Sequence, residues 1–311
     1  MRVPAILLLL ASGAFGDDAQ FNGRWDITIA HEARSRAWWM EISGAGTPQL
    51  KGKFVGFPGG NMNDIPHLTI LGGELRFNFD YKDFRSGKPM HLDYSARLRD
   101  GKVLGERRSS DGETLQWIGT PAPEIIEKDD GTWRDGTPVE LFNHKDLSGW
   151  QGLIPNLALG WEVKDGAMAN VAGANNLVSE QSFWNFKLHV EYRVGEHSNS
   201  GIGLRGRYEV QIVEDYGKPP NLHSNGALYS RIAPSENASK PAGEWQAYDI
   251  RLVGRQVTVV LNDSKVIDKG EIEGLTAIAG NADEGKPGPI ILQGDHGPVE
   301  FRNIVLTPLV K

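Results

Sequence analysis

Short stretches in which apolar and polar residues alternate follow one another from about residue 20 to residue 310, and turn residues separate them. A period of two is typical of strands that bury one face, because successive side chains of a strand point to opposite faces of the sheet. Helical periodicity is scarce, and the 38 glycines, 9 Trp, 11 Phe and 7 Tyr suit a chain of many strands and tight turns. The sequence therefore predicts an all-β protein.

The stretches fall into two groups that an irregular segment separates. Residues 17–119 predict an N-terminal β domain, and Gly23-Arg24-Trp25 resembles the Gly-x-Trp start of lipocalin-like barrels. We therefore expect a small antiparallel β-barrel-like domain there. Residues 120–137 contain two prolines and a run of four charges, which favours an exposed linker. Residues 138–311 hold many short strands without helical patterns between them, which predicts a two-sheet jelly roll of the concanavalin-like kind.

The first sixteen residues predict a signal peptide. Arg2 precedes the apolar run 3–10, and Ala14-Phe15-Gly16 fits a small-x-small cleavage site. The run is shorter than the ~20 residues that span a bilayer, so we expect no membrane span in the mature protein. The chain has no cysteine and therefore no disulfide. We expect an exported protein, periplasmic or secreted, and a net charge of −7 argues against nucleic acid as a partner.

Polar side chains on several of the expected strands suggest a binding face. Alternation places Glu209 and Gln211 on the polar face of residues 208–213, and Gln293 on that of residues 289–293. Arg, Glu and Gln can each bridge neighbouring hydroxyls of a sugar. The alternative is an ordinary solvated face, because one face of a sandwich sheet is usually wet. If all the strands concerned share one sheet, Gly203 leaves space for a ligand on a face formed by Glu191, Arg193, Arg205, Glu209, Gln211 and Gln293.

Aromatic and titratable residues in nearby loops extend this hypothesis. Trp245, Trp150 and Trp161 are candidate aromatic platforms for a sugar ring, although a Trp buried in a core is more common. His296 follows the face in a turn and is a candidate acid, base or metal ligand, with a solvated histidine as the alternative. Lys240 lies in the loop before Trp245, with a solvated lysine as the alternative. The sequence thus favours an oligosaccharide or glycoside as ligand.

Six ordered segments between residues 138 and 308 resemble the 3-keto-disaccharide hydrolase domain family. Residues 141–150, LFNHKDLSGW, are similar to the family's opening LFNGKDLSGW, and His144 stands where the family usually has Gly. The other five segments are NSGI at 199–202, YEVQI at 208–212, GALY at 226–229, KPAGEW at 240–245 and VEFRNI at 299–304.

The resemblance implies a concanavalin-like jelly roll, export, and cleavage of glycosides that carry a ketone at the sugar 3-position. Such a ketone acidifies the proton on C2, so a base can remove it, the aglycone leaves by elimination, and water adds to the product. The route needs a base, a group that stabilises the enolate, and an acid for the leaving group. Glu209, His296, Lys240 and Arg205 are suitable residue types, and their individual roles stay open. Some relatives are thought to use a divalent cation, for which the spacing here gives no sign.

Two other functions fit parts of the sequence. Residues 209–214, EVQIVE, resemble the Glu-x-Asp-x-x-Glu strand of laminarinase-type retaining glucanases, but Gln211 replaces the central Asp. A non-catalytic carbohydrate-binding module would need the platform and the hydrogen-bonding side chains but neither acid nor base. Because all six family segments follow residue 138, we expect residues 20–119 to contribute no acid or base.

Overall fold

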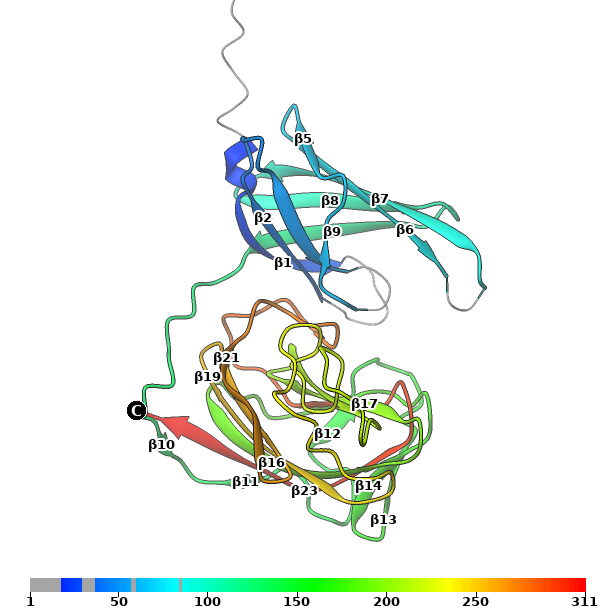
Figure 1. The fold of residues 1–311 in the computed structure, drawn as a ribbon, viewed down its shortest axis with the longest axis vertical. Helices are drawn as coiled ribbons and strands as arrows, with labels where there is room; N and C mark the ends of the chain where they lie inside the picture. The colour runs from blue at the N-terminus through cyan, green and yellow to red at the C-terminus, as the bar shows by residue number, and fades with distance from the viewer. Residues whose placement is uncertain (1–17, 30–36, 57–59, 84–85) are drawn as a thin grey trace, which may run out of the picture.

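The computed structural model describes residues 18–29, 37–56, 60–83 and 86–311, and its regular structure is almost entirely β-strand (Figure 1). A short 3-10 helix, Ala19–Phe21, precedes the first strand. No helix in the described part of the chain is long and apolar enough to cross a membrane. The all-β prediction is confirmed, whereas the expected signal peptide, residues 1–16, lies outside the described residues.

One curled antiparallel sheet of nine strands forms the N-terminal domain (Figure 1). The strands are β1 (Gly23–Ile29), β2 (Ala37–Ser43), β3 (Lys51–Val55), β4 (Asn63–Asp64), β5 (Thr69–Leu71), β6 (Glu74–Lys82), β7 (Pro89–Arg99), β8 (Lys102–Ser109) and β9 (Thr114–Pro121). The order of the described strands is β4-β3-β2-β1-β9-β8-β7-β6-β5, so β1 pairs with β9 and the two edges are β4 and β5. This near-closed meander confirms the barrel-like domain.

Aromatic side chains fill the inside of the curled sheet. Phe54 of β3, Phe77 of β6 and Tyr94 of β7 are buried, and the rings of Phe77 and Tyr94 stack with centroids 4.5 Å apart. Trp38 of β2 meets Phe54 edge to face at 5.7 Å. Phe54 also meets Phe77 and Tyr94, each with ring centroids 5.2 Å apart, so rings from strands toward opposite ends of the sheet pack together and hold its curl.

Two further sheets form the C-terminal domain. The nine-stranded sheet consists of β13 (Trp161–Lys164), β14 (Ala167–Asn170), β23 (Val299–Val310), β16 (Phe186–Val194), β19 (Gln246–Val253), β20 (Gln256–Leu261) and β21 (Ser264–Glu271), with β10 (Arg134–Asp135) and β11 (Val139–Glu140) beside β23. The five-stranded sheet has the order β12 (Trp150–Gly152), β15 (Leu177–Ser179), β22 (Ile291–Leu292), β17 (Asn199–Leu204) and β18 (Tyr208–Val213).

The two C-terminal sheets share one hydrophobic core. Leu188 and Val190 of β16 alternate with more exposed polar residues, as the sequence predicts, and point into this core. Ile202 of β17 and Val210 of β18 meet them from the five-stranded sheet. The two-sheet jelly roll is therefore confirmed.

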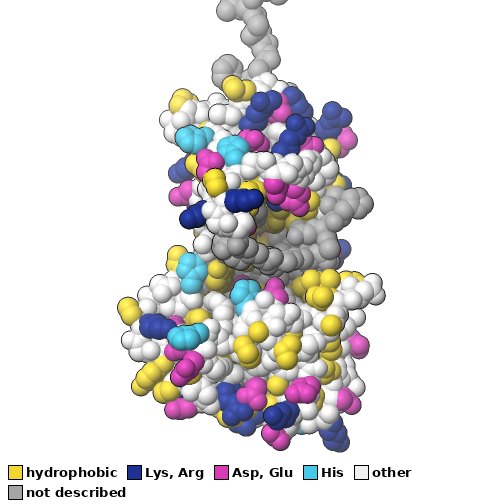
Figure 2. All heavy atoms as spheres, turned by 90° about the vertical axis from the view of Figure 1, so that its right-hand side faces the viewer, with side chains coloured by type: hydrophobic (Ala, Val, Ile, Leu, Met, Phe, Trp, Pro, Cys, Tyr) yellow, Lys and Arg dark blue, Asp and Glu magenta, His cyan; other side chains and the backbone are white. Residues whose placement is uncertain are grey.

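The N-terminal domain packs on the C-terminal domain through β2, and the two meet at a waist in Figure 2. Trp38 belongs to the core of the barrel, whereas the next residue, Trp39, belongs to the core of the C-terminal domain. Trp39 lies against Gly274, where an added Cβ atom would be 2.2 Å from its ring. The Ala37 N–H donates to the Ala279 carbonyl oxygen (2.9 Å). The segment 272–280 is thus the surface on which the barrel rests.

Ion pairs fasten the linker, residues 120–137, to the nine-stranded sheet. Asp129 accepts two hydrogen bonds from the guanidinium of Arg251, at 2.8 and 3.0 Å. Lys128 forms an ion pair with Glu271 at 2.9 Å. The segment is irregular over most of its length, but these contacts hold it against the C-terminal domain.

A second interdomain contact is a buried cluster of charged groups. Asp26 of β1 hydrogen-bonds Glu284, which also accepts a hydrogen bond from Arg255 at 2.7 Å. Arg207 also lies near enough to act on Asp26 electrostatically. Burial, and secondly the carboxylate of Glu284, raise the pKa of Asp26 to about 8. Asp26 therefore carries a proton at neutral pH and can donate it to Glu284.

We predict that this cluster makes the protein less stable as the pH rises. An aspartate has a pKa of about 3.9 in an unfolded chain, so the folded state binds the extra proton between about pH 4 and pH 8. Its stabilising effect is complete below the lower value and is lost as the pH rises through the upper one. Asp26→Asn, which mimics the protonated form, should reduce the fall in Tm between pH 5 and pH 8.5. Asp64→Asn, an exposed control, should retain the full decline, and an equal decline in Asp26→Asn would contradict the prediction.

Candidate functional site

Adjacent strands of the five-stranded sheet bring three of the predicted polar side chains together. Glu209 and Gln211 of β18 alternate with Val210, which points into the core. Gln293 follows β22, and its backbone N–H donates to the carbonyl oxygen of Gly201 in β17 at 2.9 Å. Gly201 is also the register partner of Gln211. Gly201 therefore lies between the two glutamines, on the face of the sheet that is turned away from the core.

The carboxylate of Glu209 lies above Gly201. A Cβ atom added to Gly201 would be 2.6 Å from Oε1 of Glu209, which is too close for any real contact, so only glycine leaves room for the carboxylate. Gln211 and Gln293 flank Gly201 on the two neighbouring strands. Their side-chain amides and the carboxylate of Glu209 therefore surround one position, which we call the Gly201 site. Glu209, Gln211 and Gln293 are only 3%, 2% and 8% exposed.

Two side-chain oxygens at the Gly201 site lack partners. Oε1 of Gln211 and Oε1 of Gln293 are buried and have no hydrogen-bond partner in the described structure. Leaving a buried polar group without a partner costs about 1–3 kcal/mol, so native proteins usually supply water or a ligand at such positions. Hydroxyl groups of a ligand would satisfy both oxygens. The arrangement is therefore a candidate polar binding site next to a buried carboxylate.

Two residues outside the strands fix Glu209. Its backbone N–H donates to Oγ1 of Thr276, and its carbonyl oxygen accepts the N–H of Tyr229, each at 2.9 Å. Burial, and secondly the charge of Glu209, raise the pKa of Tyr229, so its phenol stays protonated and can donate a hydrogen bond. Tyr229 was not among the residues that the sequence predicted for the site. Alternation gives no signal for it, because residues 226–230 form a turn in which the neighbours Ala227 and Leu228 are both buried.

Gly203 does not provide space for a ligand, which corrects the expectation from the sequence. A Cβ atom there would be 2.9 Å from Cβ of Ile291 and 3.3 Å from Cγ2 of Ile278. The segment 272–280 carries Ile278 onto this part of the sheet, where it forms a small apolar cluster with Val178 and Ile291. The face is thus divided into an apolar half that is covered and the polar Gly201 site.

The side chain of Arg205 does not lie on the expected polar face either. It follows β17 with a φ of 51°, and this left-handed conformation turns its side chain away from the alternation of the strand. The guanidinium donates to the carbonyl oxygen of Trp184 (2.6 Å) and to Oδ1 of Asn185 (2.9 Å). Burial lowers its pKa to about 10. Arg205 therefore supports the segment before β16 and does not extend the Gly201 site.

Glu191 and Trp245 lie in a different part of the molecule. The expectation of one shared face required β16 to join β17 and β18, but β16 belongs to the nine-stranded sheet. Glu191 accepts hydrogen bonds from Arg302 and Asn303, each at 2.7 Å. The guanidinium of Arg302 also lies 3.9 Å from the ring centroid of Trp245 and so occupies the face that a sugar would use. Arg193, expected on the same face, likewise belongs to β16.

Trp150 and Trp161, the other two candidate platforms, serve the core. Both are buried in the hydrophobic cluster of the C-terminal domain. Their indole N–H groups donate to the carbonyl oxygens of Leu141 and Asn175, each at 2.7 Å. The structure thus follows the more common alternative for a tryptophan.

His296 and Lys240, the other two candidate catalytic residues, occupy loops. His296 is exposed and its Nδ1 lies 2.8 Å from Oδ1 of Asp295. Lys240 is exposed, and its ammonium donates to the carbonyl oxygen of Trp245 at 3.1 Å. The loop of Lys240 lies beyond the end of β16, where the Gly243 N–H donates to the carbonyl oxygen of Val194. Of the three candidates, Glu209 is the one that the structure buries beside unsatisfied polar groups.

The described residues contain no group of three or more His, Cys, Asp or Glu side chains that could hold a metal ion. The carboxylate of Asp215, which follows β18, belongs to a buried hydrogen-bond network. This carboxylate accepts the N–H of Asn225 at 2.9 Å and the hydroxyl of Ser239 at 2.7 Å. Asn225 in turn accepts the hydroxyl groups of Tyr192 and Tyr248. This buried network ties the loops beside the Gly201 site to the core.

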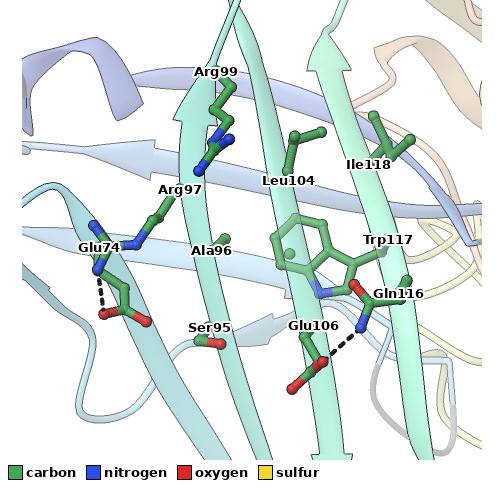
Figure 3. Close-up of a pocket in the computed structure, with 11 residues that line it drawn as sticks. Glu74, Ser95, Ala96, Arg97, Arg99, Leu104, Glu106, Gln116, Trp117 and Ile118 are labelled. Carbon is green, nitrogen blue, oxygen red and sulfur yellow. Dashed lines mark hydrogen bonds and ion pairs between the residues drawn. The ribbon is translucent and has the colours of Figure 1, made fainter.

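A cavity of about 530 Å³ on the outside of the barrel differs in kind from the Gly201 site (Figure 3). Glu74 and Arg97 pair across it at 2.9 Å, and Gln116 donates to Glu106 at 2.6 Å. Four of its polar side chains are thus paired with one another, whereas the two glutamine oxygens of the Gly201 site have no partner. This contrast makes the Gly201 site the better candidate.

Comparison with known proteins finds similarity in the C-terminal domain. A curated relative, the 3-keto-disaccharide hydrolase of Bacteroides thetaiotaomicron, is 22% identical over 169 residues, which cover 42% of this chain and 57% of the relative. A solved structure assigned to the glycosyl hydrolases, from Parabacteroides distasonis ATCC 8503, is 20% identical, with a TM-score of 0.47, and covers 57% of this chain and 100% of its own. The carbohydrate-binding module CBM66 of Bacillus subtilis is 14% identical, with a TM-score of 0.37, and covers 50% of this chain and 93% of its own.

The family itself follows from the match to a sequence profile. The profile of the 3-keto-alpha-glucoside-1,2-lyase-like domain matches residues 137–307, which is more than half of the chain. The match includes every strand that forms the Gly201 site. The chain belongs to the 3-keto-alpha-glucoside-1,2-lyase-like domain family.

Proposed function

We propose that the chain is a carbohydrate-active enzyme that cleaves glycosides bearing a ketone at C3. The observation that carries the proposal is the Gly201 site, where the carboxylate of Glu209 lies beside two buried amide oxygens without partners. The oxygens suit the hydroxyl groups of a sugar, and the carboxylate suits a base. The family and its curated relative support this choice of substrate.

The reaction can be written with the residues of this site. Glu209 removes the proton from C2, which the neighbouring ketone acidifies, and the electron pair forms an enolate. The C1–O bond then breaks, and the aglycone leaves with a proton, for which the protonated phenol of Tyr229 is a donor of the right kind. Water then adds across the new C1–C2 double bond. The sum is one glycoside and one water giving one alcohol and one 3-keto sugar. We also propose that the reaction takes place after export, on the basis of residues 1–16.

The glucanase mechanism fits the site less well. It needs two carboxylates about 5–5.5 Å apart on one face. Gln211 supplies an amide where the second carboxylate would be. Glu214 follows β18, has the opposite parity to Glu209, and lies 3.5 Å from the ammonium of Lys218.

The choice of substrate tests the elimination route. We expect cleavage of a 3-keto-glucoside and none of its unoxidised parent, because only the ketone acidifies C2. The rate of aglycone release is measured by chromatography for each compound, in reactions with and without chelator. Equal cleavage of the two compounds would point to the glucanase mechanism, and cleavage of neither would point to a binding module.

Replacing the proposed base is a second test. Glu209→Gln keeps the shape of the side chain but removes its basicity, so we expect turnover to fall by at least ~10²-fold, the lower range for general-base catalysis. The matched control is Glu191→Gln on the other sheet, which should keep turnover near that of the wild type. If Glu209→Gln raises only KM, then Glu209 binds substrate and another group is the base.

The space above Gly201 gives a third test. Gly201→Ala places a methyl group 2.6 Å from the present position of Glu209 Oε1, so the carboxylate must move. We expect a loss of turnover of ~10²-fold or more, comparable to that of Glu209→Gln. Gly195→Ala is the control, because a Cβ atom there has no neighbour within 4 Å. Unchanged turnover in Gly201→Ala would show that the carboxylate position does not matter.

A further inference from the structure

A segment of the N-terminal domain reaches the C-terminal domain beside the Gly201 site. Between β3 and β4, the Oδ1 atom of Asn61 lies 2.7 Å from Nε2 of His223. The next residue, Met62, donates its N–H to Oγ of Ser230 at 3.0 Å. Both partners lie in the loop region that follows β18 and contains Tyr229. These contacts join the barrel to the edge of the site through residues outside its main interface.

A short chain of contacts leads from Asn61 to Glu209. The ring of His223 meets the ring of Tyr229 edge to face, with centroids 5.0 Å apart. The backbone of Tyr229 donates to the carbonyl oxygen of Glu209. Gly60 approaches the same tyrosine, since a Cβ atom added there would be 3.8 Å from Cε1 of Tyr229. His223 thus contacts Tyr229, Gly60 of the barrel segment lies close to it, and Tyr229 lies next to the proposed base.

We propose that Asn61 is a positioning residue, through which the N-terminal domain completes the sugar site. Its amide oxygen accepts the Nε2–H of His223 and so fixes the orientation and tautomer of the imidazole. The fixed imidazole, together with Gly60, holds the phenol ring of Tyr229 in place for the substrate. Asn61 supplies no proton itself, so catalysis still belongs to the C-terminal domain. The inference rests on the proposed function for its part in catalysis, whereas the contact with His223 does not depend on the reaction.

The contact can be tested without any substrate. Asn61→Asp replaces the amide by a carboxylate, whose negative charge stabilises the imidazolium. We expect the NMR titration midpoint of His223 to rise by about 1 pH unit in this variant, with the resonance assigned through His223→Gln. Lys53→Ala, which removes an interdomain ion pair with Glu273, is the control and should leave the midpoint unchanged. An unchanged midpoint in Asn61→Asp would overturn the proposal.

The role in catalysis is tested on the full chain with a 3-keto-glucoside. We expect Asn61→Ala to lower kcat by about tenfold, the scale of one neutral hydrogen bond, while Lys53→Ala stays within about twofold of the wild type. Asn61→Asp should move the pH profile of kcat in the same direction as the midpoint of His223. Wild-type kcat in Asn61→Ala, or an equal loss in Lys53→Ala, would overturn the positioning role.

If the wild type is inactive, the proposed function is refuted, and the role of Asn61 is then tested by a binding measurement. In that case a disaccharide is titrated into the wild type and into Asn61→Ala, and the His223 resonance is followed. A shift in the wild type that Asn61→Ala weakens supports the role of Asn61 at a sugar site. No shift in the wild type would overturn it.

Discussion

The five-stranded sheet is buried on both faces, and the rest of the structure depends on how each face is covered. The nine-stranded sheet covers one face with apolar side chains, as in any sandwich. The other face would ordinarily be wet, but Ile278 covers its apolar half, and Glu209, Gln211 and Gln293 are buried in its polar half. Burying a carboxylate and two amides is costly unless each finds partners. The Gly201 site therefore holds a carboxylate and two amides almost entirely out of water.

Two glycines of β17 determine which side chains cover each half of that face. Gly201 and Gly203 are two residues apart on one strand and point the same way. The first leaves room for the Glu209 carboxylate, and the second leaves room for Ile278 and Ile291. One glycine thus makes room for a charged group and the other for apolar packing, although the two lie only about 7 Å apart along the strand. The sequence alone cannot separate the two, because the difference depends on a segment some seventy residues away that folds back over the sheet.

Local sequence patterns predicted the orientation of side chains along single strands well. They predicted less well which strands share a sheet and which segments cover it, because these features depend on distant parts of the chain. Alternation placed Glu209 and Gln211 on the polar face, because parity along one strand is a property of that strand. It also grouped Glu191 with them, which required β16 to share their sheet, and sheet membership depends on long-range pairing. Strand β2 shows no alternation, since Trp38 and Trp39 are both buried, one in each domain, so a period of two cannot predict it. The family segments, in contrast, include most of β17 and β18, which carry Gly201 and Glu209, but they include neither β22 nor Gln293.

The segment 272–280 links the packing of the two domains to the site. Thr276 and Ile278 face the sheet, where they bind the backbone of Glu209 and cover Gly203. Gly274 faces the barrel and has a φ of 68°, which leaves the space that Trp39 fills. A side chain at Gly274 would have to displace either the indole or the segment itself. Because Gly274 lies two residues before Thr276, a displacement of the segment at the contact between Gly274 and Trp39 would move Thr276, and with it the backbone of the proposed base.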